Sequence, residues 1–279
     1  MSSKMQLIFG DWRLGRILMF IMITSSVSYG LGGTLLNVIL AGLVGATLSA
    51  GGFFFDYLGD YKKDRASGNL KNPIARGTLS PRGGLLFTLL CFSISSIVCI
   101  IINPWALISI VCLIGVIGGL VHGVLDTALL RAFSLGALQS LYVLIGALFA
   151  YNFELSVVLL ALFLFFAMTG ARVLGDTRDL PYDEKTDTKT IPKKYGVKWG
   201  GIFLLINELI AYIVGITIYL LGLLGIGYLI CMIGIIAVGF PLTLLFIFHP
   251  TPKIARISNV LSLAILGSLF VVAMFLGRL

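Results

Sequence analysis

Two short segments of the chain each carry three aspartates at helical spacing. They are Asp56, Asp60 and Asp64 in the first segment, and Asp176, Asp179 and Asp183 in the second. Side chains three or four residues apart lie on one face of a helix, and like charges placed there repel one another. A cation between them removes that cost. Mg²⁺ is suited to this role, because it prefers a few carboxylate oxygens together with the phosphate oxygens of a substrate.

Pro181 lies within the second segment. A proline removes one helical hydrogen bond and disfavours helical geometry at the residue before it. We therefore expect Asp176 and Asp179 to share a face and Asp183 to lie beyond a kink.

Basic residues are interleaved with the aspartates. They are Lys62, Lys63, Arg65, Arg172, Arg178 and Lys189. Such groups bind phosphate oxygens through charge-assisted hydrogen bonds. Solvated loops also combine aspartate and lysine, but two aspartate triplets in corresponding positions are unusual for them. The pattern predicts two carboxylate faces that hold a magnesium-bridged diphosphate across a central cavity.

The rest of the chain is too apolar for a soluble protein. Of its 279 residues, 58% are hydrophobic and 11% are charged, whereas soluble domains average roughly 25% charged residues. Nine apolar segments have lengths near the roughly 20 residues that cross a bilayer as a helix. They are 17–32, 34–55, 84–102, 104–124, 132–151, 155–171, 200–221, 223–248 and 258–276.

These segments predict an all-α polytopic membrane protein with nine transmembrane helices around a central cavity. The two long Asp-rich loops, 57–83 and 172–199, follow the second and sixth segments. This spacing suggests two pseudo-repeated four-helix halves plus a ninth helix, and residues 1–279 are expected to form a single transmembrane domain.

The basic residues lie almost entirely on one side of the predicted bundle. Of the twenty Lys and Arg residues, only Arg278 lies on the other side. By the positive-inside rule, the N-terminus and both Asp-rich loops face the cytoplasm and the C-terminus lies outside the cell membrane. This placement explains the net charge of +8 without nucleic acid, and part of the excess can bind anionic membrane lipids.

The two Asp-rich segments resemble the signatures of the UbiA superfamily of intramembrane prenyltransferases. The first signature resembles N-D-x-x-D-x-x-x-D followed by R-P-x-x-x-G. Asp60 and Asp64 match its later aspartates, and residues 72–77 (Asn-Pro-Ile-Ala-Arg-Gly) resemble its trailing stretch. The chain departs from the pattern at Asp56, where the family usually has Asn, and at Tyr57, where it often has Asp.

The second signature resembles D-x-x-D-x-x-x-D followed by K-T-L-P. Asp176, Asp179 and Asp183 match its aspartates, and residues 189–192 (Lys-Thr-Ile-Pro) match the stretch after them. The resemblance covers essentially the whole chain, and the second signature is the more specific of the two.

The resemblance implies a nine-helix fold, Mg²⁺ as cofactor, and transfer of a prenyl group from a prenyl diphosphate to an acceptor. It implies that all six aspartates bind metal and that Asp60, Asp179 and Lys189 are catalytic. The diphosphate contacts that it implies are Lys62, Lys63, Arg65, Arg131, Arg172 and Lys189, although Arg131 is equally well explained as a membrane anchor. The acceptor stays open between a small aromatic quinone precursor and a glycerol-based lipid.

Three further residues are weaker candidates for the acceptor site or the cavity. Relatives carry an arginine near the acceptor at the position of Arg16, but we favour a membrane-anchoring role for Arg16 and its neighbour Arg13. Tyr142 is more simply explained by core packing. Glu208 is the one carboxylate well inside an apolar segment, where acids are costly and often functional. It could orient an acceptor or pair with a neighbouring helix.

Two other classes of membrane protein are possible. A CDP-alcohol phosphotransferase would carry a D-G-x-x-A-R signature, which the sequence lacks, and would leave the second aspartate segment unexplained. A transporter usually places ionisable groups near the bilayer midplane, where this chain has only Glu208. His122 and His249 have no partner at ligand spacing and are expected to be structural.

The charge distribution makes a topological prediction. A tag at the C-terminus is expected to be reachable from outside intact cells, whereas a cysteine placed at Lys185 is not, because the Asp-rich loops lie in the cytoplasm. Labelling intact cells with a membrane-impermeant maleimide tests this. External labelling at position 185 would contradict the predicted orientation.

Overall fold

The computed structural model describes residues 13–121 and 127–277, so His122 and Arg278 lie outside the described residues. Within these residues every regular element is a helix. The helices are α2 (Leu14–Gly30), α3 (Leu35–Ser67), α4 (Pro81–Ile102), α5 (Ala106–Val121), α6 (Ala128–Phe149), α7 (Leu155–Asp183), α8 (Ile191–Tyr195), α9 (Val197–Leu220), α10 (Ile226–Phe248), α11 (Pro252–Leu261), a π-helix (Ser262–Leu266) and α12 (Gly267–Leu276).

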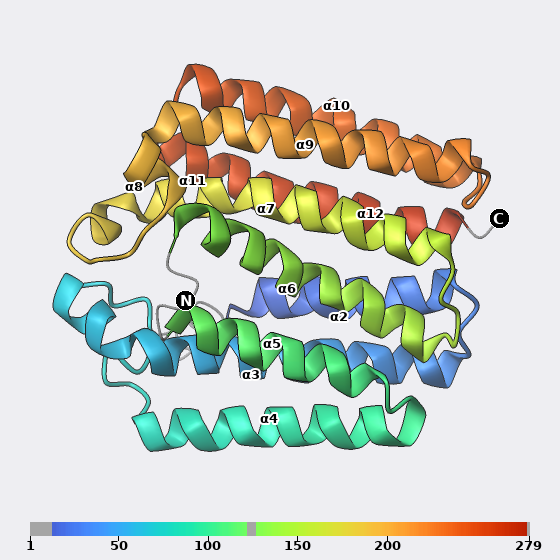
Figure 1. The fold of residues 1–279 in the computed structure, drawn as a ribbon, viewed down its shortest axis with the longest axis horizontal. Helices are drawn as coiled ribbons and strands as arrows, with labels where there is room; N and C mark the ends of the chain where they lie inside the picture. The colour runs from blue at the N-terminus through green and yellow to red at the C-terminus, as the bar shows by residue number, and fades with distance from the viewer. Residues whose placement is uncertain (1–12, 122–126, 278–279) are drawn as a thin grey trace, which may run out of the picture.

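The long helices lie side by side in one bundle (Figure 1). Six of them, α3, α4, α6, α7, α9 and α10, are long and apolar enough to cross a membrane, and α2, α5 and α12 are shorter apolar helices. The prediction of an all-α integral membrane protein is confirmed. That all nine cross the bilayer, and that they form two repeated halves, stay predictions.

Helices α3 and α7 continue well beyond the apolar segments that predicted them. They contain 33 and 29 residues. Helices of these lengths are about 50 Å and about 44 Å long, whereas the hydrocarbon core is about 30 Å thick. Their last turns therefore extend out of the apolar layer and carry the aspartates. Much of what we predicted as loops 57–83 and 172–199 is thus helical.

Pro181 does not end α7. The helix passes through Pro181 and ends at Asp183, and Glu184 N–H still donates to Leu180 O at 2.9 Å. Asp183 therefore belongs to the same helix as Asp176, instead of following a break. Pro181 is tolerated because only one hydrogen bond is lost, in the last turn of the helix.

The segment after α3 folds back onto that helix. Gly68 ends α3 with a φ of 79°, which glycine adopts without strain. The side chain of Asn72 donates to Tyr57 O and to Asp64 Oδ2, each at 2.9 Å. Arg65 donates to Ala75 O at 3.0 Å and to Ile74 O at 3.3 Å. These bonds hold the segment beside the end of α3.

Small residues allow the helices to approach closely, as is usual where lipid supplies no hydrophobic drive for packing. A Cβ added at Gly45 in α3 would lie 2.8 Å from the carbonyl oxygen of Phe20 in α2. A Cβ at Gly146 in α6 would lie 2.7 Å from the carbonyl oxygen of Thr24. Helix α2 is therefore held between α3 and α6 by direct contacts with the glycines of both.

Replacing Gly146 tests this packing. Gly146→Ala is expected to lower the free energy of unfolding by about 1–3 kcal/mol, because the new methyl group meets backbone that cannot rotate away. Thermal unfolding in one detergent measures the effect.

The matched control is Gly118→Ala in α5, where a Cβ meets nothing within 4 Å. Alanine there is expected to be neutral or to stabilise by up to about 1 kcal/mol. Equal thermal shifts for the two variants would show that close packing at Gly146 is not required.

Candidate active site

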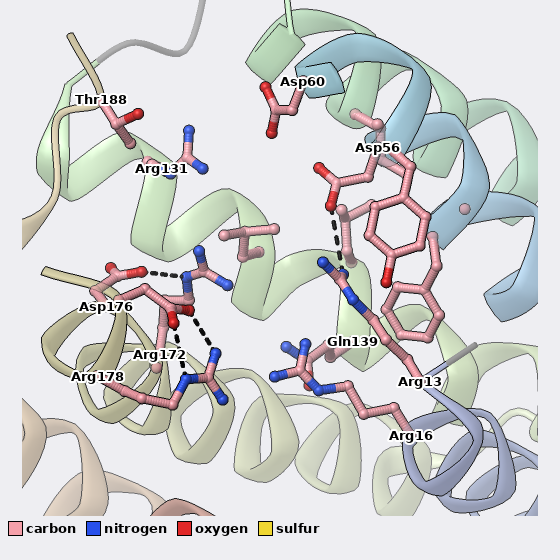
Figure 2. Close-up of a pocket in the computed structure, with 18 of the residues that line it drawn as sticks. Arg13, Arg16, Asp56, Asp60, Arg131, Gln139, Arg172, Asp176, Arg178 and Thr188 are labelled. Atoms are coloured by element: carbon pink, nitrogen blue, oxygen red, sulfur yellow. Dashed lines mark hydrogen bonds and ion pairs between the residues drawn. The ribbon is translucent and has the colours of Figure 1, made fainter. Parts of the chain in front are cut away.

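A cavity of about 270 Å³ lies between the N-terminal end of α2, the C-terminal ends of α3 and α7, and α6. All six of the aspartates identified in the sequence line it. Figure 2 shows Asp56 and Asp60 on one wall and Asp176 on the opposite wall. The long extensions of α3 and α7 are what bring the two aspartate segments, more than a hundred residues apart, to one cavity.

Basic side chains line the same cavity. They are Arg13, Arg16, Lys63, Arg131, Arg172 and Arg178. Among the described residues that line the cavity, six carboxylates therefore face six basic groups. The site is close to electrically neutral before any ligand binds.

The carboxylates of α3 differ in their partners. Asp56 pairs with Arg13 at 3.4 Å, and Asp64 accepts hydrogen bonds from Asn69 at 3.0 Å and from Asn72 at 2.9 Å. Asp60 has no ion-pair or hydrogen-bond partner within the described chain. It is the carboxylate of this helix that is most available to a ligand.

Arg13 contacts aromatic rings as well as Asp56. Its guanidinium lies 4.6 Å from the ring centroid of Tyr57 and 5.0 Å from that of Phe53. Burial opposes its charge, but Tyr57 and Asp56 together hold the pKa of Arg13 above its usual value. The sequence favours a membrane-anchoring role for Arg13 and Arg16, but in the structure both line the cavity.

In the part of the chain that the structure describes, the carboxylates of α7 also include two that are paired with basic side chains and one that is not. Arg172 Nε lies 2.8 Å from Asp176 Oδ1. Asp179 accepts from Arg178 Nε at 3.0 Å and from Lys71 Nζ at 2.7 Å. The Lys71 bond ties the segment after α3 to α7. Within the described residues, the carboxylate of Asp183 has no such partner.

The residues fit a hard cation bound together with an anion better than a bare cation. In the described part of the chain no three acidic, histidine or cysteine side chains converge to form a metal site. The expected clusters of three ligands are therefore not preformed, because arginine, lysine and asparagine already hold four of the six carboxylates. Asp60 and Asp183 supply free oxygen donors, and Mg²⁺ commonly completes its shell with substrate phosphate oxygens and water.

The arginines fit the anion. Arg131 Nε is buried and has no hydrogen-bond partner, and no ion pair reaches Arg16 or Arg131 within residues 13–121 and 127–277. A buried donor without a partner is costly. A phosphate oxygen in the cavity would satisfy it.

Three predicted diphosphate contacts are not part of the cavity lining. Arg65 is engaged by the carbonyl groups of Ile74 and Ala75, and its contact with diphosphate stays a prediction. Lys62 is exposed, and its ammonium group lies 6.0 Å from the ring centroid of Tyr61. Lys189 is also exposed and lies outside the lining, although Thr188 contributes to it.

The weaker candidates divide between two cavities. Tyr142 lines the aspartate cavity and stacks on Phe20, with ring centroids 4.0 Å apart, so it both packs and faces the site. Glu208 lines a second, smaller pocket deeper in the bundle.

Several polar residues of the aspartate cavity could not be predicted from the sequence. They are Ser49, Ser67, Asn69, Gln139, Tyr182, Thr186 and Thr188. Their spacing carries no signal, because each reaches the cavity only through the packing of helices from different parts of the chain. Of these residues, only Thr186 and Thr188 had a local indication in the sequence, since they lie within three residues of the stretch 189–192.

The inner wall of the cavity is apolar. Its lining includes Met19, Phe20, Leu113, Ile117, Leu135, Leu138 and Met168. One cavity therefore joins a charged mouth to an apolar interior. That combination suits a molecule with a charged head group and a hydrocarbon tail.

Comparison with known proteins agrees with this geometry. The profile of the UbiA prenyltransferase family matches residues 17–276. No curated protein sequence matches significantly.

Solved structures share the fold at low sequence identity. A UbiA homologue from Aeropyrum pernix K1 superposes with a TM-score of 0.78 at 18% identity, covering 94% of this chain and 98% of that one. A structure described as digeranylgeranylglyceryl phosphate synthase gives a TM-score of 0.74 at 20% identity, covering 99% of both chains. A homologue from Archaeoglobus fulgidus, bound to GPP and Mg²⁺, gives 0.73 at 18% identity, covering 95% and 98%.

The family profile spans nearly all of the helical bundle, including both aspartate-bearing helix ends. The chain therefore belongs to the UbiA family of membrane prenyltransferases.

Proposed function

We propose that the protein transfers a prenyl group from an isoprenyl diphosphate to an aromatic or glycerol-lipid acceptor within the membrane, in a Mg²⁺-dependent reaction that releases diphosphate. The observation that carries this proposal is the cavity in which two aspartate-bearing helix ends face each other above an apolar interior. The Archaeoglobus fulgidus homologue has been seen with GPP or DMAPP together with Mg²⁺, which supports the choice of ligands.

The charge balance of the cavity explains why metal and diphosphate would bind together. A diphosphate alone adds several negative charges to a site that already holds six carboxylates. A cation alone would bind weakly, because arginine and lysine already neutralise most of the negative charge of the carboxylates. Each ligand lowers the electrostatic cost of placing the other, so their binding is coupled.

Different residues of the cavity would bind the metal and the diphosphate. Asp60 and Asp183 offer oxygen donors to the metal, and Asp179 can join them if its bonds to Arg178 and Lys71 are released. Arg16 and Arg131 are free to bind phosphate oxygens. Bound Mg²⁺ would act as a Lewis acid that stabilises the departing diphosphate.

The apolar interior supplies the rest of the site. Its side chains would hold the prenyl tail and keep water from a carbon that gains positive charge as the C–O bond loosens. The stacked rings of Phe20 and Tyr142 lie in this wall, where an aromatic face can stabilise a cation.

The acceptor remains one of two classes, an aromatic quinone precursor or a glycerol-based lipid. One similar structure is described as a synthase of a glyceryl phosphate lipid, but at 20% identity that likeness concerns the fold. A panel of both acceptor classes with labelled geranyl and geranylgeranyl diphosphates tests the function and identifies the class. Absence of diphosphate release with every acceptor would oppose the proposal.

Removing a carboxylate from either helix tests the two-sided site. Asp60→Asn and Asp179→Asn are each expected to reduce turnover by about a hundredfold or more, since each loses charge that positions the metal and diphosphate. Release of labelled diphosphate at saturating Mg²⁺ is the measurement.

Asp187→Asn is the matched control, because Asp187 is exposed and lies outside the cavity lining. It should retain nearly full activity. Near-full activity in either cavity variant, with wild-type thermal stability, would refute a site built from both helices.

Coupled binding is tested by thermal shift. Mg²⁺ alone and geranylgeranyl diphosphate alone should each stabilise the protein little, and the pair should stabilise it by more than the sum of the two. A ligand at about a hundred times its dissociation constant contributes roughly 2.7 kcal/mol. Arg131→Ala should reduce the joint effect and leave the response to Mg²⁺ alone unchanged. Purely additive shifts would indicate independent sites, as expected of a transporter.

A further inference from the structure

A carboxyl group lies deep in the bundle, away from the aspartates. Glu208 in α9 is only 9% exposed. Its Oε1 accepts a hydrogen bond from the Tyr212 hydroxyl, one turn along the helix. The Thr243 hydroxyl of α10 also contacts the carboxyl group. The other oxygen, Oε2, is buried and, among the residues that the structure describes, has no hydrogen-bond partner of good geometry.

The contacts with Tyr212 and Thr243 do not give Oε2 a well-placed donor of its own. When Glu208 is ionised, Oε2 needs a hydrogen-bond donor once it is removed from water. Among the ten buried side-chain atoms that lack a partner in the described residues, it is the one carboxylate oxygen. A purely structural pair would satisfy both oxygens. The free oxygen points to a bound molecule.

Space for that molecule lies beside Glu208. A pocket of about 80 Å³ is lined mostly by apolar side chains, with Glu208, Tyr212, Thr243 and Asn259 as polar members. Part of its wall is the π-helical turn at Ser262–Leu266, and such turns occur frequently at functional sites.

This pocket adjoins the aspartate cavity. Met19, Met168, Ala171 and Asn259 line both spaces. A molecule in the smaller pocket is therefore separated from the larger cavity by no more than these shared side chains.

The depth of the pocket indicates which substrate would use it. A Cβ added at Gly170 of α7 would lie 3.1 Å from Asn207 Cβ, so Glu208 is nearly level with Gly170. Asp176 is six residues further along α7, which is about 9 Å along a helix axis. The pocket thus lies beneath the proposed diphosphate site, further into the apolar interior.

We propose that this pocket binds a hydroxyl group of the acceptor, with Glu208 Oε2 accepting its hydrogen bond. This inference rests on the proposed function and specifies which chemical group of the acceptor is recognised. An anionic group would be repelled by Glu208, and an ether or hydrocarbon has no hydrogen to donate. A phenol and the alcohol of a glycerol lipid share the required chemistry.

Matched probes test the pocket without knowledge of the natural acceptor. Para-nonylphenol is compared with its methyl ether, and dodecanol with dodecyl methyl ether, by calorimetric titration of the purified protein with and without Mg²⁺ and geranylgeranyl diphosphate. In the wild type at least one hydroxyl probe should bind about tenfold more tightly than its ether, the scale of one hydrogen bond to a charged group. The pair with the larger ratio distinguishes a phenolic from an aliphatic acceptor.

Two variants assign the preference to Glu208. Glu208→Leu should bring the ratio of affinities close to one. Glu208→Gln keeps the shape and should also lower the ratio, because its amide can donate to the ether oxygen. Thr217→Val, at a half-buried position of α9 that lines neither pocket, is the control and should keep the wild-type ratio.

Two results would overturn the proposal. They are a wild-type ratio near one for both pairs, and a ratio that survives in both Glu208 variants. Binding of geranylgeranyl diphosphate with Mg²⁺ is recorded separately in each protein. If the wild type does not bind geranylgeranyl diphosphate with Mg²⁺, the result counts against the prenyltransferase function. The ratio of hydroxyl to ether affinities tests only whether the pocket binds a hydroxyl group.

Discussion

A carboxylate is strongly disfavoured in hydrocarbon, and six carboxylates at the ends of α3 and α7 repel one another even in water. The bundle accommodates them by carrying both helices beyond the apolar layer and by surrounding the carboxylates with arginine, lysine and asparagine. Four of the six are paired in this way. The near-neutral cavity that results is the feature on which metal binding, diphosphate binding and their coupling all depend.

This electrostatic balance requires precise helix positions. Arg13 reaches Asp56 only because α2 is packed directly against α3, and the glycine contacts at Gly45 and Gly146 set that distance. Lys71 reaches Asp179 only because Asn72 and Arg65 fold the following segment back onto α3. Packing in the apolar layer thus determines the geometry of charges outside it.

The apolar interior has a different role. It offers no charge of its own to a prenyl tail, and its one deep carboxyl group, Glu208, stands apart from the metal-binding residues in an adjoining pocket. Separating the two polar regions by apolar side chains would allow the donor and the acceptor to be recognised by different chemistry. Their reacting carbons would then meet in the water-poor space between these regions.

The sequence by itself determined the helical class, the apolar segments and the two aspartate faces, because each follows from local periodicity and from the cost of unpaired backbone in lipid. It did not determine which cations meet which carboxylates. Arg65 and Arg13 have similar chemistry in the sequence, yet Arg65 bonds to backbone carbonyls and Arg13 enters the cavity. Only tertiary packing decided this, since pairing between distant helices depends on their relative position and rotation. The same packing allowed α7 to continue through Pro181 and left one oxygen of Glu208 without a well-placed partner among residues 13–121 and 127–277.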